Sequence, residues 1–150
     1  MTREFLKRLE EQVSPWPGIS VHPHRFGGRE FCIGSSEVGH VHNDGAVEIP
    51  FPRAFRDELL AEGLAAKHRW VPESGWVTFL VRDERDLQHA VWLIRLSYLR
   101  YVLKAVPDPA KRFQEESEQL QLSPRIKAVL HRFVPQRKDS AAGAGLAKSA

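Results

Sequence analysis

The chain has very little cysteine and no long apolar run. Its 150 residues include one cysteine, Cys32, so a disulfide within the chain and a cysteine-based zinc finger are both excluded. No segment approaches the roughly 20 consecutive apolar residues of a membrane-spanning helix, and the first residues lack the apolar core of a signal peptide. These absences predict a soluble chain, no membrane partner and a reducing, cytoplasmic location.

Most of the chain also has no net positive charge. The formal net charge is +3, yet residues 125–150 contain six Lys or Arg and one acid, which leaves residues 1–124 at −2. Proteins that bind nucleic acid concentrate their cations on a folded face. We therefore expect no nucleic-acid partner, and the partner class left open is a small molecule or another protein.

Several motifs of enzyme families are absent. The sequence contains no G-x-S-x-G nucleophile elbow and no glycine-rich loop of the P-loop or dinucleotide-binding type. Cys32 is expected to be a small buried side chain. Trp70, Trp76, Trp92 and Tyr98 are interpreted as core aromatics and are not assigned to a cofactor.

Length and composition predict one domain followed by a tail. A chain with 42% hydrophobic residues can bury a core of ordinary domain size. From Gln136 onward the residues are small and polar, and such a segment cannot offset the entropy lost on ordering. We expect a single α+β domain over residues 1–135 and a disordered basic tail over residues 136–150.

Alternation and turn residues predict an antiparallel sheet built from three hairpins. The expected strand pairs are 19–26 with 29–33 around Gly27-Gly28, 38–42 with 46–49, and 64–71 with 76–81 around a Pro-Glu-Ser-Gly turn. Pro23 indicates that the first strand lies at an edge, because proline cannot donate a ladder hydrogen bond.

Helical periodicity predicts the elements that cover this sheet. Apolar residues at helical spacing favour a short helix over 3–13, an inserted helix over 53–62 and a long helix from 84 to about 103. Two shorter helices are expected after Asp108-Pro109 and Ser123-Pro124, because each pair places a capping residue before a proline. Arg95, Arg100 and Lys104 are expected on the solvated flank of the long helix.

The loop of the second hairpin is decided by side-chain alternation. A two-residue loop, Asp44-Gly45, would pair His40 with Ile49 and mix polar and apolar residues on both faces. A three-residue loop with Gly45 in the left-handed region pairs His40 with Glu48 instead. The second register is expected, because it gives one apolar face and one face with His40, His42, Ala46 and Glu48.

Linked motifs across about residues 30–101 resemble the luciferase-domain family of small bacterial and fungal proteins. The motifs that carry the resemblance include Gly39-His40-Val41-His42, Ile49-Pro50-Phe51-Pro52, Leu59-Leu60-Ala61-Glu62-Gly63, Pro72-Glu73-Ser74-Gly75-Trp76 and Ala90-Val91-Trp92-Leu93. The family name is not evidence of light emission, because flavin-dependent luciferases are barrels, and such a barrel typically needs about 250 residues.

The candidate site is the pair His40 and His42 opposite Glu48. Two imidazoles and one carboxylate can hold a divalent transition metal, such as Fe(II), Mn(II), Ni(II) or Zn(II), and leave positions open for substrate or oxygen. Proton transfer is assigned to His68, and His68, His22 or His24 can complete the ligand set. The spacing from Gly34 to Glu48 approximates the first metal motif of a cupin, but the acid comes late and no second motif follows.

Ordinary structural interpretations stay open beside the metal site. Alternating histidines can occupy a solvated sheet face or pair with Glu48 and Asp44, and His68 can be a hydrogen-bonded core histidine. The sequence therefore leaves two functions: binding of a small ligand or metal for oxidative chemistry, and a non-catalytic protein-interaction module. It does not decide whether the protein is an enzyme.

Overall fold

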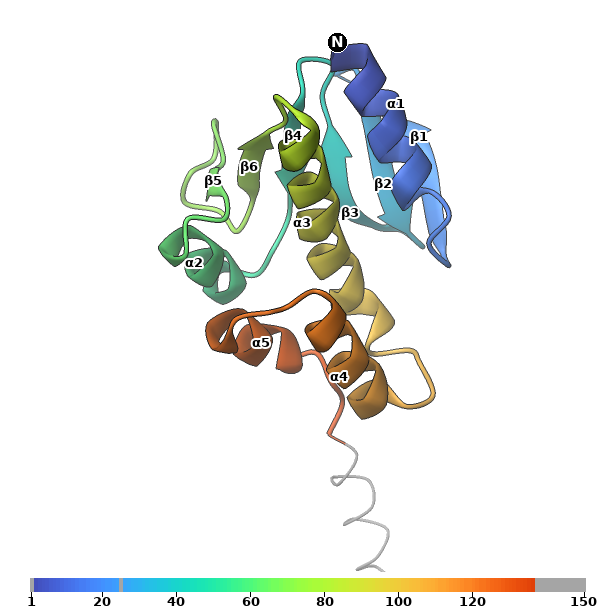
Figure 1. Cartoon of the computed structure of the whole chain (residues 1–150), viewed down its shortest axis with the longest axis vertical. Helices are drawn as coiled ribbons and strands as arrows, with labels where there is room; N and C mark the ends of the chain where they lie inside the picture. Colours follow the sequence, from blue (N-terminus) through green and yellow to red (C-terminus); the bar gives the residue numbers. More distant parts are fainter. Residues whose placement is uncertain (1, 25, 137–150) are drawn as a thin grey trace, which may run out of the picture.

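A six-stranded antiparallel sheet lies under a layer of helices (Figure 1). The computed structural model describes residues 2–24 and 26–136. The strands are β1 (Ile19–Pro23), β2 (Arg29–Ile33), β3 (Ser36–Val41), β4 (Ala46–Ile49), β5 (Ala66–Lys67) and β6 (Val77–Leu80). Their order in the sheet is β1-β2-β3-β4-β6-β5, so β1 and β5 are the edges and the predicted edge position of Pro23 is confirmed.

Three of the five helices within the described residues begin at the capping residues that the sequence predicts. The helices are α1 (Thr2–Val13), α2 (Arg53–Ala61), α3 (Glu84–Val102), α4 (Pro109–Gln119) and α5 (Pro124–His131). The side chains of Asp83, Asp108 and Ser123 each accept a hydrogen bond from a backbone N–H of the first turn of α3, α4 and α5. The predicted α+β class, with one helix inserted between hairpins, is confirmed.

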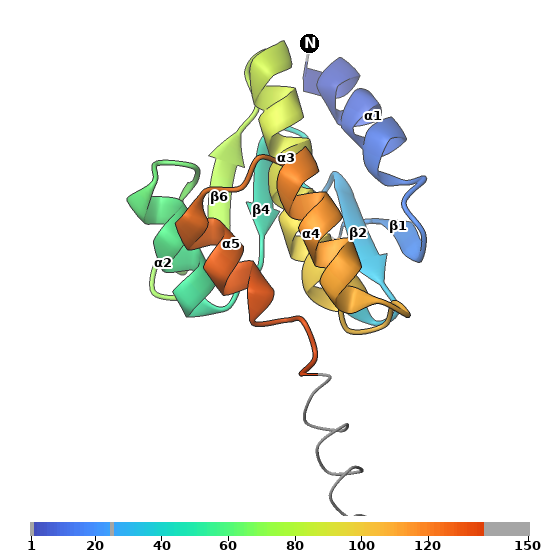
Figure 2. The same ribbon diagram turned by 60° about the horizontal axis from the view of Figure 1, so that its bottom comes forward.

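The long helix α3 is the centre of the core. It crosses the sheet on one face, and α4 and α5 lie on its other side (Figures 1 and 2). Because α3 has neighbours on both sides, it buries more than the single apolar stripe expected for it: Leu93, Leu96 and Leu99 are also fully buried. Trp92 Nε1 donates to the Leu120 carbonyl at the end of α4, at 3.0 Å.

The same double packing corrects one prediction about α3. Arg100 is 8% exposed, and its guanidinium donates to the Pro50 carbonyl at 2.6 Å and to Ser97 Oγ at 3.0 Å. Arg95 pairs with Glu116 of α4 at 2.6 Å. The expectation of a solvated flank was therefore wrong for Arg100, because its helix face turns toward the segment that joins β4 to α2.

Two predicted hairpins have longer loops than expected. β1 ends at Pro23, which is opposite Arg29, so the connection is longer than the expected Gly27-Gly28. β5 has only two residues, and residues 68–76 leave the sheet as a long loop. Arg56 of α2 holds that loop by donating to the carbonyls of Pro72 and Ser74, at 2.9 and 2.8 Å.

One row of directly opposed residues crosses all six strands. It runs His22, Glu30, His40, Glu48, Thr78, Ala66. Opposed residues of antiparallel strands lie on the same face, so this row defines a polar face, while Val41 and Val47 belong to the face that packs on α3. The fold therefore keeps one sheet face for side chains that carry chemistry.

No helix within residues 2–24 and 26–136 is long and apolar enough to cross a membrane. The predicted tail over residues 136–150 lies outside the described residues, apart from Gln136, which is exposed.

Candidate metal centre

The β3–β4 hairpin places the two histidines and the carboxylate together. His40 is opposite Glu48, and Val41 is opposite Val47, as the alternation predicted. Gly45 has φ 92°, its N–H donates to the His42 carbonyl at 3.0 Å, and the Ala46 N–H donates to Asp44 at 3.0 Å. The predicted three-residue loop with a left-handed Gly45 is confirmed, and this loop fixes which side chains share the polar face.

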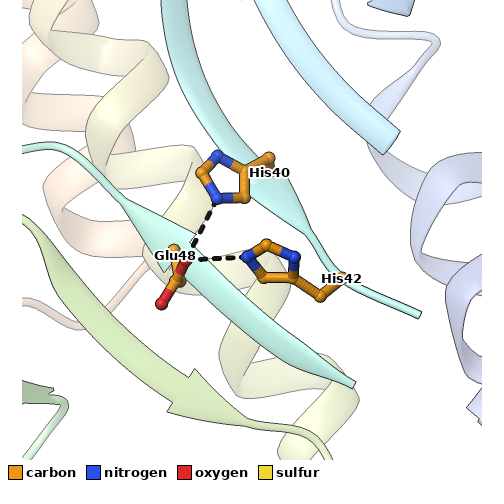
Figure 3. Close-up of side chains that lie close together, drawn as sticks. All are labelled: His40, His42 and Glu48. Carbon is orange, nitrogen blue, oxygen red and sulfur yellow. Dashed lines mark hydrogen bonds and ion pairs between the residues drawn. The ribbon is translucent and has the colours of Figure 1, made fainter. Parts of the chain in front are cut away.

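Both imidazoles point their Nε2 atoms at one oxygen of Glu48 (Figure 3). His40 Nε2 lies 3.1 Å from Glu48 Oε1, and His42 Nε2 lies 2.8 Å from the same oxygen. The three ligand atoms are all within 4.8 Å of one another. Metal bonds of about 2.1 Å place neighbouring ligand atoms about 3.0–3.4 Å apart, so small rotations of these side chains would admit an ion. Figure 3 shows the group on the sheet face away from the helices.

The second oxygen of Glu48 faces a different set of groups. Arg69 Nε and Thr78 Oγ1 both donate to Oε2 at 3.2 Å, and His68 Nε2 also lies 3.2 Å from it. The Glu48 side chain is 1% exposed. Burial alone would raise the pKa of Glu48, but hydrogen bonds from His42, His40 and Arg69, with the charge of His68, lower it to about 2. Glu48 is therefore a buried carboxylate ion whose Oε1 faces the two imidazoles.

His40 is held from its other side by Glu37. Its Nδ1 lies 2.5 Å from Glu37 Oε2, while its Nε2 faces Glu48. Burial lowers the pKa of His40, but the hydrogen bonds and charges of Glu37 and Glu48 outweigh it and raise the pKa above its ordinary value. A carboxylate at each nitrogen favours the doubly protonated ring in the metal-free chain, and a metal ion would replace the proton on Nε2.

Glu37 reaches His40 because of an irregularity in the sheet. Residues three apart on a regular strand lie on opposite faces. Between β2 and β3 the register shifts: Phe31 is opposite Gly39, but Cys32 is opposite Glu37. One residue of β3 is thus extra, and this β-bulge turns Glu37 to the side of His40. Glu37 was not among the residues predicted from the sequence, because a bulge leaves no signal in the alternation.

His68 lies in the site, and its hydrogen bonds fix its proton. The backbone N–H groups of Trp70 and Val71 donate to His68 Nδ1, at 3.1 and 3.3 Å. A nitrogen that accepts these bonds carries no proton, so a neutral His68 has its proton on Nε2, next to Glu48 Oε2. A neutral His68 therefore turns its N–H toward the carboxylate, and both its nitrogens already have partners.

Of the other predicted candidates, His24 joins the cluster and His22 stays apart from it. His24 stacks on His40 with ring centroids 4.1 Å apart, and burial followed by the charges of His40 and His42 lowers the pKa of His24. His22 is exposed and bonds to Ser20 Oγ at 2.9 Å. Cys32 is buried as expected, and its thiol donates to Glu30 at 3.4 Å.

Aromatic side chains rim the site. Trp76 lies beside His40, with centroids 5.4 Å apart, and Trp70 lies beside His42 at 6.4 Å. Trp70 is 67% exposed and Phe26 is 72% exposed, so the prediction that Trp70 is a core residue was wrong. It fails because residue 70 belongs to the long loop and not to a strand. A hollow of about 330 Å³ lies between Phe26, Trp70 and His42.

Part of the chain resembles a known family. Residues 35–97 match the family model described as Luciferase domain. The predicted resemblance is thereby confirmed, and the matched residues include His40, His42, Glu48 and His68, whereas His24 and Phe26 precede the match. No curated protein and no solved structure matches the chain.

The loop that contains Gly28 approaches β3 so closely that it requires glycine. A Cβ on Gly28 would overlap the Val41 carbonyl oxygen, and Gly28 has φ 90°. Gly28→Ala is therefore expected to lower the free energy of unfolding by about 2–3 kcal/mol, as measured by urea denaturation.

Gly34→Ala is the matched control for this prediction. Gly34 also has a positive φ, 61°, but a Cβ added there would have no atom within 4 Å. It should lose about 1 kcal/mol from backbone strain alone. Equal losses in the two variants would show that the contact of Gly28 with β3 contributes nothing.

Proposed function

We propose that this chain binds one divalent transition metal ion through His40 Nε2, His42 Nε2 and Glu48 Oε1. The observation that carries the proposal is the convergence of both imidazoles on a single oxygen of a buried carboxylate, 3.1 and 2.8 Å away. Two histidines and one carboxylate suit Fe(II), Mn(II), Ni(II) or Zn(II). Three protein ligands leave coordination positions for a small molecule, and a metal bound there would supply Lewis-acid or oxidative chemistry.

Neighbouring residues support this assignment. Metal-binding histidines usually donate their second nitrogen to a carboxylate, and Glu37 holds His40 Nδ1 in this way. Arg69 and Thr78 hold Glu48 Oε2, which leaves Oε1 as the oxygen available to the metal. His68 is proposed to move a proton to or from Glu48 Oε2, since its Nε2 lies 3.2 Å away. The small molecule would enter through the hollow beside Trp70 and His42.

Metal content tests the proposal directly. Tag-free protein purified without chelator is expected to contain close to one transition-metal ion per chain by mass spectrometry, or to take up one Zn²⁺ on dialysis. The double variant His40→Ala/His42→Ala removes two of three ligands, so its content should fall below about one tenth of an ion per chain.

His131→Ala is the control for this measurement, because His131 is an exposed histidine at the end of α5 and no part of the polar sheet face. It should keep the metal of the unmodified chain. Equal metal content in all three proteins would mean that bound metal is nonspecific. A metal-free chain that also takes up no Zn²⁺ on dialysis would refute the site.

A protein-interaction module is the second candidate function. Its support is the group of exposed apolar side chains at the loop tips, Phe26, Trp70 and Val71, which are 72%, 67% and 47% exposed. The two candidates differ in the role of His40 and His42. If they serve only the structure, the double alanine variant changes stability but leaves metal content and partner binding unaltered.

A further inference from the structure

We infer that a second ligand site, for a small organic anion with an apolar body, lies at the β5 edge of the sheet. A hollow of about 710 Å³ opens there between β5, β6 and the first turn of α3. This volume is in the usual range for small-molecule sites. The inference goes beyond the proposed metal centre and does not depend on it.

Part of the lining of this hollow, termed here the edge groove, is apolar. Leu64, Ala66 and Leu80 line it. Leu80 is 41% exposed, one of the few large hydrophobic side chains with that exposure in the described residues. A solvent-facing leucine beside an open hollow gives an apolar ligand a surface to cover. These apolar side chains therefore favour a ligand with a hydrocarbon part over a fully polar ligand.

Other lining residues of the edge groove supply positive charge. Lys67, Arg69 and Arg82 line it together with two acids, Asp44 and Asp86. Both acids already have partners: Asp44 pairs with Arg69 at 3.6 Å, and Asp86 accepts from the Arg82 backbone N–H at 3.0 Å. Arg69 is also engaged, because it pairs with Glu48 at 3.2 Å.

Two of the three cations stay available. Within the described part of the chain, no carboxylate lies within 4.0 Å of the side-chain nitrogens of Lys67 or Arg82, although twelve such ion pairs occur elsewhere in it. Two cations without a carboxylate partner, beside apolar side chains, complement a ligand in which a carboxylate is attached to a hydrocarbon group. The groove thus selects ligands by charge as well as by hydrophobic contact.

The position of the edge groove connects it to the polar sheet face. Thr78 lines the groove, and its hydroxyl donates to Glu48 Oε2 at 3.2 Å. Arg69 also reaches from the groove to the same oxygen. A ligand in the groove would therefore be separated from Glu48 Oε2 by one side chain, and Oε2 is not the oxygen that faces His40 and His42.

Benzoate is the probe that tests the edge groove, and benzamide is its neutral analogue of the same shape. In ¹H–¹⁵N NMR titrations of the full chain, benzoate is expected to bind with a Kd of about 1 mM. The shifted amide signals should be those of residues 64–67 and 78–82. Benzamide should bind at least about tenfold more weakly, because it cannot pair with Lys67 and Arg82.

Charge-removal variants separate the groove from general surface attraction. Lys67→Gln/Arg82→Gln should weaken benzoate binding at least about tenfold, and both positions are exposed, so the fold is retained. Arg85→Gln removes an exposed cation of the same helix end that does not line the groove, and it should bind benzoate as the unmodified chain does. Equal binding of benzamide, an unaltered Kd in the double variant, or shifts confined to other residues would each overturn the inference.

Discussion

Glu48→Gln is expected to lower the free energy of unfolding of the metal-free protein by about 3–5 kcal/mol. The carboxylate is 1% exposed, and it faces His40, His42, His68, Arg69 and Thr78. Glutamine removes the negative charge and turns an NH₂ group toward donors, so buried cations lose their counterion. Urea denaturation at pH 7 with chelator present measures the loss.

Glu73→Gln is the matched control, because Glu73 is an exposed glutamate in the loop over residues 68–76. Its substitution should change stability by less than about 0.5 kcal/mol. If Glu48→Gln lowers the free energy of unfolding by no more than this, the hydrogen bonds and ion pairs around Glu48 do not stabilise the fold.

The stability difference between the unmodified chain and Glu48→Gln is also expected to depend on pH, and the direction of this dependence follows from the pKa of Glu48. Folding lowers the pKa of Glu48 from 4.5 to about 2. A carboxyl group with a depressed pKa in the folded state stabilises fully above its unfolded pKa and loses this contribution as the pH falls through the folded value. The stability difference between the unmodified chain and Glu48→Gln should therefore shrink as the pH falls from about 4.5 toward 2.

Much of the sheet was predictable because alternation and glycine constrain short hairpins strongly. The pairing of His40 with Glu48 follows from a choice between two loop lengths, and only one of these gives an apolar face. The caps of α3, α4 and α5 were also predictable, because Asp83, Asp108 and Ser123 act on their own first turns. These features depend on contacts between residues that are close in sequence.

The parts that were not predictable depend on contacts between distant residues. Trp70 was expected in a strand, but Arg56 holds the loop over residues 68–76 away from the sheet through the Pro72 and Ser74 carbonyls. Arg100 was expected in solvent, yet it donates to Pro50, which is 50 positions away. Side-chain periodicity reports only which face of an element is apolar, so it cannot reveal such long-range hydrogen bonds.

The candidate site divides in the same way. The sequence grouped His40, His42 and Glu48 because they share one hairpin. The sequence assigned proton transfer to His68 but did not predict where His68 lies relative to Glu48. It missed Glu37, because only the β-bulge opposite Phe31 and Cys32 turns Glu37 toward His40. A histidine with a glutamate three residues before it on a strand is a signal worth testing when a bulge is suspected.

Glu37→Gln is expected to weaken the binding of Zn²⁺ or Co²⁺ at the proposed centre about 10- to 100-fold. The Glu37 carboxylate lies 2.5 Å from His40 Nδ1, where it orients the ring and makes Nε2 a better ligand. Glutamine keeps a hydrogen-bond acceptor at this place but removes the charge. Competition with a chromophoric chelator measures the affinity, and the visible spectrum of bound Co²⁺ shows whether the coordination geometry survives.

Glu30→Gln is the matched control, since Glu30 lies on the same sheet face, directly opposite His40, and accepts a bond from Cys32. Loss of general negative potential would weaken metal binding equally in both variants. A loss confined to Glu37→Gln, with the Co²⁺ spectrum retained, would assign the effect to the hydrogen bond on Nδ1. Unchanged affinity in both variants would mean that His40 is oriented by its stacking on His24, 4.1 Å away, and not by Glu37.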